Sequence, residues 1–526
     1  MGRGVVSITP YTALTAILIA AVLALGCGAG NDASEDSAST ITVLYESDDY
    51  ILGPSRDDSP KFLMFLPLVQ GYGSQAKPRL AERWEHSADY TTWTFFLRRD
   101  VKWHDGVPVT AHDVAFSFEL FAHPDVLFAQ DNILFADIAV PDDYTLRITW
   151  SQPTGPDQAL MGWTVYYPKH LLEGLDPTGF FAWDFWTHPI GNGPYRYVRG
   201  VPHTMIELEA NPDHFAGKPA IERVVLKLST SNKVIELTSG TADAAYYVPP
   251  ADVIKLAADP RFRVYHLFAF TEPQAIHWNR RNPLLADATV RRALSYAIDR
   301  RELLEVNNLP AETPLLGGLS PWDRIGSLLQ EGKLDEGFQY DPEIAKRLLQ
   351  EAGWSDENGD GVRERGSEEA RFTMLAPQGG LSAVESALLV QDQLRDVGVA
   401  MDIRPVERSV WRELYRSGEF DATIWDVPNV PQLLLDQDFF GDGTKIGYHN
   451  SEIVRLLEAL TVELNPEGQD SLYARINEIL RLDVPVTFLH PYVETSVAHR
   501  RIRGLRTPDR TNLLEYVDEL WIEGER

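Results

Sequence analysis

The sequence predicts an α/β protein of two or three domains, and two observations carry this prediction. The chain has 526 residues, well past the roughly 250–300 residues at which a single hydrophobic core stops growing. Between Phe372 and Val427, strand-like and helix-like segments follow in the order strand, helix, strand, helix, strand. This order is typical of parallel strands joined by crossover helices, so part of the chain should form a parallel sheet.

Strands and helices are also predicted outside that region. Residues 93–97 and 144–150 alternate large apolar side chains with mostly polar ones, which predicts strands with one buried face. Thr110 and Asp113 have the spacing of a capping box, and Asp341-Pro342 is typical of a helix start. Apolar residues at helical spacing predict four inward faces: Val114, Phe118 and Phe121; Val290, Ala293, Leu294, Ala297 and Ile298; Ile344, Ala345, Leu348, Leu349 and Ala352; and Ile453, Leu456, Leu457, Leu460 and Leu464.

The N-terminus predicts export and lipidation. Thr12–Leu25 is an uncharged apolar run, which is the length of a signal-peptide core and too short to span a membrane. Ala24-Leu25-Gly26-Cys27 follows directly and resembles a bacterial lipobox. We therefore expect residues 1–27 to be a lipoprotein signal peptide with Cys27 as the lipidated residue, and residues 28–40 to be a flexible tether. The alternative is a plain secreted signal with an incidental cysteine.

Composition excludes several classes of function. Lys and Arg number 48 against 77 Asp and Glu, giving a net charge of −29, so nucleic-acid binding is not expected. One cysteine in the whole chain allows neither an intramolecular disulfide nor a cysteine-based metal cage. No Gly-x-Ser-x-Gly elbow and no His-Glu-x-x-His motif occurs. Paired carboxylates remain open, so a secreted hydrolase acting on peptides or glycans is kept as the alternative function.

Five blocks, in the right order over most of the chain, resemble the family 5 extracellular solute-binding proteins. These are the oligopeptide, dipeptide and nickel-binding receptors of ABC importers. The blocks begin with Pro78–Glu85 together with Thr91–Glu119, and continue with Pro189–Val198, Ala210–Lys227, Trp278–Leu303 and Asp341–Trp354. The resemblance covers the chain from about Ile41 to the C-terminus.

The resemblance implies a two-lobed periplasmic-binding-protein fold, type II-like, with an extra domain inserted in the first lobe. The base domain of lobe I should comprise residues 41–77, 189–272 and 485–526. The inserted domain should span residues 78–188, and lobe II residues 273–484. The two lobes are expected to close around a solute.

The function implied by the resemblance is that of a lipid-anchored extracytoplasmic receptor. It should capture a peptide or peptide-like solute in an interlobe cleft and deliver it to the membrane subunits of an ABC importer. No enzyme activity, cofactor or bound metal is expected, and the protein should be a monomer in the cell envelope. The expected solute-binding residues are Tyr45, Glu46 and Ser47 after the first strand, and Trp425, Asp426 and Asn429 in the second lobe.

Each of these residues has a structural alternative, and the cargo stays open. The aromatic side chains could instead pack in the core, and Asp426 could instead cap a helix. Ile424–Asn429 lacks the Gly-Trp-x-x-Asp spacing of dipeptide receptors, and Pro377–Gly380 lacks their arginine. A free dipeptide is therefore not favoured, whereas longer peptides, oligosaccharides and chelated metals all remain.

Three further motifs are interpreted as structural. Trp103–Gly106 contains a His–Asp pair but is typical of a strand entering a tight turn. Gly191–Pro194 is interpreted as a turn, since no Walker-type Lys and Ser/Thr follow it. Asp356–Gly361 matches the first half of a calcium loop, but its twelfth position is Ser367 and the glutamate, Glu368, comes one residue late. Calcium binding stays open as the alternative to an acidic turn.

Overall fold

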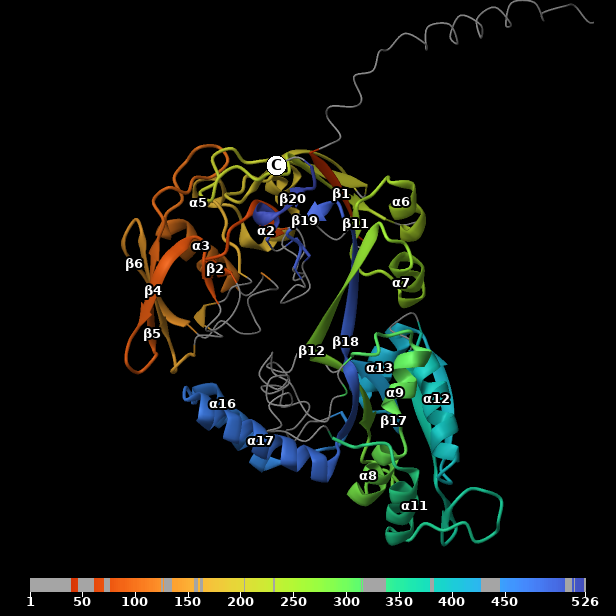
Figure 1. Cartoon of the computed structure of the whole chain (residues 1–526). Helices are drawn as coiled ribbons and strands as arrows, with labels where there is room; N and C mark the ends of the chain where they lie inside the picture. Colours follow the sequence, from red (N-terminus) through yellow and green to blue (C-terminus); the bar gives the residue numbers. More distant parts are fainter. Residues whose placement is uncertain are drawn as a thin grey trace, which may run out of the picture.

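The computed structural model describes residues 39–45, 61–70, 76–123, 126, 135–155, 159–160, 164–202, 204–229, 232–313, 315, 337–378, 383–426, 445–506, 513–514 and 516–524. Figure 1 shows two lobes, which are joined by two long strands, β12 (Phe262–Trp278) and β18 (Val486–His499). Among the residues so described, none of the helices has the length and hydrophobicity needed to cross a bilayer.

A single ten-stranded sheet runs through both lobes. Its order is β16-β15-β17-β12-β18-β11-β1-β10-β9-β8. Lobe II contributes β15 (Arg371–Pro377), β16 (Ala400–Val406) and β17 (Ala422–Asp426). Lobe I contributes β1 (Thr40–Tyr45), β8 (Tyr195–Val201), β9 (Met205–Ala210), β10 (Arg223–Leu228) and β11 (Ala244–Ala245). The lobes are thus two halves of one sheet, held together by the central β12–β18 pair.

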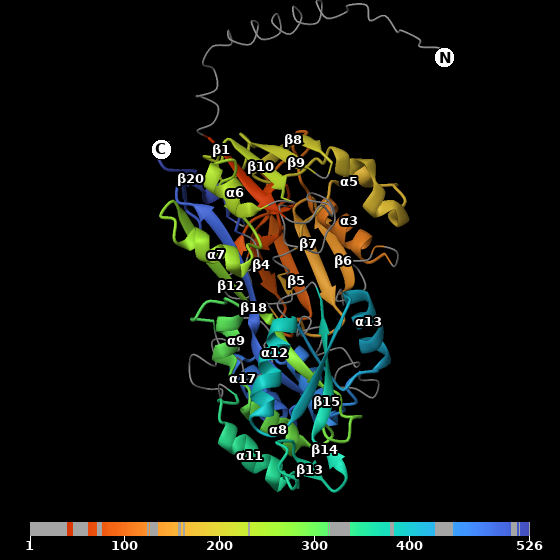
Figure 2. The ribbon, with the colours of Figure 1, turned by 90° about the vertical axis from the view of Figure 1, so that its right-hand side faces the viewer.

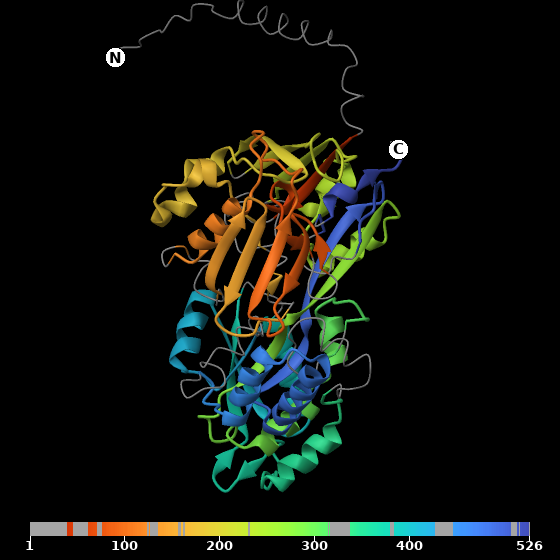
Figure 3. The same cartoon turned by 90° about the vertical axis from the view of Figure 1, so that its left-hand side faces the viewer.

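The four-stranded sheet of lobe I confirms the two strands predicted in this part of the chain. Its order is β4 (Ala81–His86), β5 (Thr92–Leu97), β7 (Thr145–Trp150) and β6 (Phe135–Asp142), and it stands in front in Figure 3. Helix α3 (Ala111–Phe121) packs against β6 and β7. At its start, the Asp113 carboxylate accepts the Thr110 N–H at 2.8 Å, as the capping box predicts.

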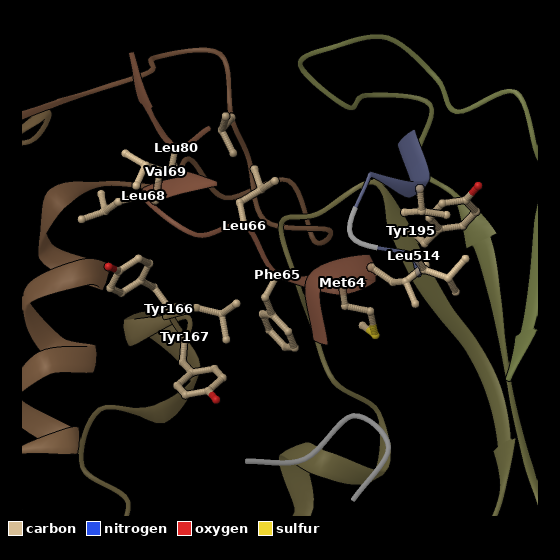
Figure 4. Close-up of a cluster of buried hydrophobic side chains, with 14 of the residues drawn as sticks. Met64, Phe65, Leu66, Leu68, Val69, Leu80, Tyr166, Tyr167, Tyr195 and Leu514 are labelled. Atoms are coloured by element: carbon tan, nitrogen blue, oxygen red, sulfur yellow. The ribbon is translucent and has the colours of Figure 1, made fainter. Parts of the chain in front are cut away.

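One continuous core lies under this sheet and extends into the rest of lobe I, and a second, smaller core contains Leu44, Leu237 and Val497. The larger core brings together segments that are far apart in the sequence (Figure 4). It contains side chains between Met64, the last residue of α2 (Lys61–Met64), and Val69, together with Leu80, Tyr166, Tyr167, Tyr195 and Leu514. The Tyr195 hydroxyl donates to the carbonyl of Ile221 at 2.9 Å. Because the buried residues described between 78 and 188 share the larger core with Ile41, Tyr195 and Leu226, the division of lobe I into a base and an inserted domain stays a prediction.

Trp103–Gly106 and Gly191–Pro194 pack on each other and are structural. The Gly191 N–H donates to His104 Nδ1 at 3.2 Å, so His104 Nε2 carries the proton that it donates to the Gly193 carbonyl at 3.1 Å. Burial lowers the pKa of His104 to about 4, which keeps this imidazole neutral. A Cβ on Gly191 would lie 2.0 Å from the Met64 carbonyl oxygen, so only glycine fits the turn.

In lobe II, helices cover both faces of the sheet (Figure 2). One face carries α8 (Ala288–Tyr296), α9 (Arg300–Val306), α11 (Pro342–Glu351) and α12 (Ala383–Arg395). The other carries α13 (Arg408–Ser417), α16 (Ser451–Val462) and α17 (Pro466–Asp483). The Asp341 side chain accepts the Ile344 N–H at 2.9 Å, as predicted for the start of α11. β16 and β17 both pair in parallel with β15, which confirms the predicted parallel sheet.

Two buried arginines fix the helices of lobe II to the returning strand. Arg291 donates from Nε to the Val484 carbonyl at 2.9 Å and from Nη1 to the Leu285 carbonyl at 2.6 Å. Arg300 donates from Nε to the Phe488 carbonyl at 2.8 Å. Burial lowers the pKa of both guanidinium groups to about 10, so both stay charged at neutral pH. These backbone contacts explain two arginines of the block Trp278–Leu303.

The remaining elements are short. They are β2 (Val69–Gln70), β3 (Lys77–Pro78), α5 (Lys169–Leu172), η2 (Pro177–Ala182), η3 (Asp184–Thr187), α6 (Lys233–Ser239), α7 (Pro250–Ala257), β13 (Glu364–Arg365), β14 (Glu368–Glu369), β19 (Ile502–Arg503), η4 (Val517–Glu519) and β20 (Trp521–Ile522).

A buried ion pair fastens the C-terminal segment to lobe I. Arg79 Nη1 lies 2.7 Å from Asp518 Oδ2, with side-chain exposures of 11% and 6%. His214 Nε2 lies 3.6 Å from the same oxygen. Burial by itself would raise the pKa of Asp518, but His214 and Arg79 together hold this pKa at about 2.

We predict that Asp518→Asn lowers the free energy of unfolding by about 3–5 kcal/mol, because it leaves the buried Arg79 without its counter-charge. The matched control is Glu519→Gln, whose carboxylate pairs with Arg506 at the surface and should cost about 1 kcal/mol or less. Denaturant unfolding measures both. Similar losses in the two variants would contradict the role assigned to Asp518.

The ion pair of Arg79 with Asp518 also predicts that the free energy of unfolding depends on pH. The pKa of Asp518 is about 2 in the folded protein against an ordinary value of 3.8. Its stabilising contribution is therefore complete above the ordinary pKa and is lost as the pH falls toward the folded value. Between pH 5 and pH 2, the wild-type protein should lose more unfolding free energy than Asp518→Asn does. Equal losses of unfolding free energy in the wild-type protein and Asp518→Asn would contradict this role of the Asp518 carboxylate.

Candidate functional site

Parallel strands from both lobes end at the junction between the lobes (Figure 1). In lobe I, β1 pairs in parallel with β10 and β11, and β11 runs antiparallel to β18. In lobe II, β15 pairs in parallel with β17, and β17 runs antiparallel to β12. Since β12 and β18 are antiparallel to each other, the carboxyl ends of both sets point toward the junction. Open α/β sheets bind their ligands at such edges.

The β12–β18 pairing is interrupted at this junction. The register runs regularly to Ala269–Tyr492 and resumes at Gln274–His490, so residues 270–273 stand opposite Pro491 alone. A second shift separates Gln274 from Ala275. Pro273 and Pro491 carry no amide hydrogen and donate nothing to the ladder. The two strands that connect the lobes are therefore least constrained where the candidate site lies.

On the lobe I side, the predicted Tyr45 is the last residue of β1 and packs against Tyr246. Their ring centroids are 4.6 Å apart in a stacked arrangement, and Tyr45 is 5% exposed. Burial raises the pKa of both hydroxyls well above its ordinary value, and the nearby Glu494 raises each further. Tyr45 thus belongs to the buried wall of this edge. Glu46 and Ser47, predicted beside it, lie outside the described residues.

The segment that follows β11 completes this wall and was missed by the sequence reasoning. Lys233, which is buried, donates from Nζ to the carbonyls of Tyr246 and Tyr247 at 2.7 and 2.9 Å. Tyr247 has φ +50°, a left-handed conformation that costs a non-glycine residue free energy and that the lysine helps to hold. The only available signal was a pair of tyrosines just before Pro249-Pro250, because a two-residue strand gives no periodicity.

Glu494 places a carboxylate on the same face. It is 3% exposed, and the alternation of β18 puts it on the side of Ala498, which shares a core with Tyr45 and Tyr246. Nearer the interruption, Gln274 and His490 are 2% and 6% exposed. Burial lowers the pKa of His490 to about 4, so the imidazole is neutral at physiological pH. His490 Nδ1 lies 2.7 Å from the Pro491 carbonyl oxygen and carries the proton.

On the lobe II side, the predicted Trp425 ends an aromatic stack. Trp425 is half-buried, and its ring lies 4.5 Å from that of Trp411, which stacks on Tyr415 at 5.1 Å. Tyr415 in turn stacks on Phe420 at 5.5 Å. On the outer side, the guanidinium carbon of Arg408 lies 5.1 Å from the Trp425 ring centroid. Trp411 and Arg408 were not predicted, because their contacts depend on how α13 packs.

The structure places the remaining predicted residues as follows. Asp426 is the last residue of β17 and pairs with Gln274, so its backbone lies at the interrupted part of the sheet. The Asp426 side chain, Asn429 and Cys27 lie outside the described residues.

One group of carboxylates could hold a cation, but it lies elsewhere. Asp356, Asp360 and Glu364 bring oxygens within 4.8 Å of one another. Asp356 and Asp360 belong to the loop before β13, and Glu364 is the first residue of β13, at the end of lobe II farthest from lobe I (Figure 2). Backbone amides already bond to this loop's side chains, including the N–H of Gly359 to Asp356 at 2.7 Å. The loop has no part in the site at the junction.

Comparison with known proteins identifies the family. The sequence profile of the bacterial extracellular solute-binding proteins, family 5, matches residues 75–434. The oligopeptide-binding protein AppA of Bacillus subtilis is 26% identical over 421 residues, covering 75% of this chain and 74% of AppA.

Two solved structures share the fold. AppA of Bacillus subtilis in complex with a nonapeptide has a TM-score of 0.68 at 23% identity, covering 92% of this chain and 98% of that one. NikZ of Campylobacter jejuni in complex with Ni(L-His) has a TM-score of 0.74 at 23% identity, covering 92% and 99%. They confirm the predicted two-lobed α/β fold.

Because the profile spans well over half of the chain, the protein belongs to the bacterial extracellular solute-binding proteins of family 5, which are receptors and not enzymes.

Proposed function

We propose that this receptor captures a peptide at the junction of its lobes and delivers it to the membrane subunits of an ABC importer. One observation carries the proposal: the carboxyl ends of parallel strands from both lobes converge where the β12–β18 pairing is interrupted. A solute held there touches both lobes, so its binding free energy can favour one arrangement of the lobes over another. The membrane subunits of the importer can then bind one arrangement of the lobes in preference to the other.

A peptide fits the side chains at this junction better than a bare ion does. Half-buried Trp425 offers an aromatic face on the lobe II side. On the lobe I side, the buried pair Tyr45 and Tyr246 supports the edge from within, and the buried Glu494, Gln274 and His490 make the surroundings partly polar. Mixed apolar and polar linings suit organic solutes. The relative AppA, named for oligopeptides and solved with a nonapeptide, supports this choice. Oligosaccharides and chelated metals are the alternatives to be tested.

The anchor and the domain scheme are part of the same proposal. Cys27 would carry the lipid, residues 28–40 would serve as tether, and the mature protein would act as a monomer at the outer face of a membrane. Lobe I would comprise the base segments 41–77, 189–272 and 485–526 with the inserted residues 78–188, and lobe II residues 273–484.

The anchor predicts that Cys27→Ala moves the protein from the membrane fraction to the soluble extracytoplasmic fraction. The melting temperature should not change, because the proposed tether carries no hydrophobic core. Cell fractionation followed by thermal unfolding of the released protein measures both. Cys27→Ala protein that still sediments with membranes would refute the lipid anchor and leave the receptor function untouched.

Peptide binding predicts a rise in thermal stability. A solute that binds only the folded state adds about 2.7 kcal/mol at 100 times its Kd. We expect a pooled tetrapeptide mixture to raise the melting temperature, while nickel with histidine and a malto-oligosaccharide leave it unchanged. Stabilisation by one of the latter two alone would replace the peptide as cargo. Steady hydrolysis of the peptides would contradict the receptor assignment itself.

Asp426 is proposed to pair with a cationic group of the solute, since it follows Trp425 at the carboxyl end of β17. Asp426→Asn should then weaken peptide binding about 10- to 150-fold, the value of a charge-assisted hydrogen bond. An N-acetylated peptide should bind wild type and variant equally. Glu419→Gln also neutralises a carboxylate, three residues before β17 begins, and serves as the control in calorimetric titration. A lowered melting temperature with unchanged affinity would make Asp426 a structural cap.

A further inference from the structure

Five arginines surround the end of the β12–β18 pair that lies away from the junction of the lobes. β12 begins at Phe262 and β18 ends at His499, and these two residues pair with each other. Just beyond them, the Arg500 N–H donates to the Arg261 carbonyl at 2.8 Å. The five residues, which we call the arginine patch, are Arg261, Arg263, Arg500, Arg501 and Arg503. They form a local group of cations in a chain whose net charge is −29.

Carboxylates neutralise only part of the charge of the arginine patch. Three of its members have an ion-pair partner at 2.6 to 2.8 Å: Asp259 for Arg261, Asp243 for Arg501 and Glu523 for Arg503. Arg263 and Arg500 are exposed, and neither forms an ion pair with a carboxylate in the described ranges of the chain. The patch therefore keeps the positive charge of these two side chains.

The two unpaired arginines lie close together, around the side chain of Tyr265. The guanidinium carbon of Arg263 lies 5.2 Å from the Tyr265 ring centroid. Burial raises the pKa of the Tyr265 hydroxyl, and the charges of Arg263, Arg500 and Arg503 oppose this rise, which shows that all three act on one small area. Arg500 Nε also donates to the Phe262 carbonyl at 2.9 Å. This hydrogen bond holds the Arg500 guanidinium beside the start of β12.

The first strand of the fold begins beside the arginine patch. β1 begins at Thr40, and Arg501 Nη2 donates to the Thr40 carbonyl at 2.8 Å. Figures 1 and 2 show β1 and β20 together at the end of lobe I that lies away from lobe II. Cys27, the proposed site of the lipid, lies 13 residues before Thr40 in the sequence. A flexible segment of this length has a root-mean-square span of about 20 Å, so a lipid on Cys27 would keep the patch close to the bilayer.

We propose that the arginine patch binds the anionic headgroups of the membrane that carries the receptor, and so turns this end of lobe I toward the lipid surface. The inference rests on the proposed lipid anchor and is independent of the cargo. Guanidinium groups bind phosphate oxygens through two parallel N–H···O bonds. The negative charge of the rest of the chain opposes this binding only weakly, because at physiological salt charges are screened beyond about 8 Å.

The test uses residues 28–526 without the lipid, so that no acyl chain contributes to binding. This chain contains every described residue. Co-sedimentation measures its binding to vesicles of phosphatidylcholine, with and without phosphatidylglycerol. The proteins compared are wild type, Arg263→Gln/Arg500→Gln, Arg263→Lys/Arg500→Lys and the control Arg412→Gln/Arg416→Gln. The two control arginines are exposed on α13 of lobe II and likewise form no ion pair within the described part of the chain.

Wild type and the control should bind vesicles with phosphatidylglycerol more tightly than vesicles of phosphatidylcholine alone. Each arginine near an anionic bilayer strengthens binding about fivefold, so Arg263→Gln/Arg500→Gln should bind the anionic vesicles about 30-fold more weakly than wild type. Arg263→Lys/Arg500→Lys should keep most of the binding, because attraction to a charged surface depends mainly on the charge. Added salt should weaken the binding of wild type.

The possible outcomes separate this inference from the proposed function. Equal binding of wild type to both kinds of vesicle would overturn the role of the arginine patch and leave the anchor and the receptor untouched. The same loss of binding in the control would assign the effect to net charge and also overturn it. Tight calorimetric binding of soluble glycerol phosphate would replace the membrane surface by a discrete phosphate site. Failure of the anchor would appear separately, as Cys27→Ala protein that stays with the membranes.

Discussion

The pairing of β12 with β18 is the constraint on which the rest of the structure depends. These two strands lie at the centre of the ten-stranded sheet and carry the chain from lobe I to lobe II and back. Each lobe builds its own cores on its half of the sheet, so the relative position of the lobes depends on the continuity of this pair. The register breaks at residues 270–273 and Pro491, and an interruption of this kind bends the strand that carries the extra residues.

The motifs that identify the family mostly build this scaffold and do not line the site. His104 with the glycines of Gly191–Pro194 locks one turn onto another, and Arg291 and Arg300 bind backbone carbonyls inside lobe II. The candidate site instead uses strand ends and the segments after them. Such segments vary without cost to the core. This explains how proteins of one fold are found with a nonapeptide and with Ni(L-His).

The sequence predicted what local patterns determine. The strands at 93–97 and 144–150, the starts of α3 and α11, and the parallel order of β15, β16 and β17 were all confirmed. The position of Trp425 at a strand end was also predictable, since the largely apolar run Ala422–Trp425 stops there and Asp426 and Pro428 follow in the sequence. The Lys233 contact with the tyrosines after β11 and the Arg408–Trp425 stack were not. Each depends on contacts between segments whose packing no local pattern encodes.

At the junction of the lobes, the side chains are held in place by their neighbours, whereas the pairing of β12 with β18 is interrupted. This difference affects the free energy of solute binding. Tyr45 and Tyr246 are buried and held by neighbours, and the Trp425 stack is hydrogen-bonded to its sheet. A solute that binds at this proposed site would therefore order few side chains, which would keep the entropic cost low. The least regular part of the junction is the backbone where the β12–β18 pairing is interrupted. A solute that touched only one lobe would bind every arrangement of the lobes equally and signal nothing. Recognition groups on both sides of the junction are thus a physical requirement for a receptor that reports its cargo through its shape.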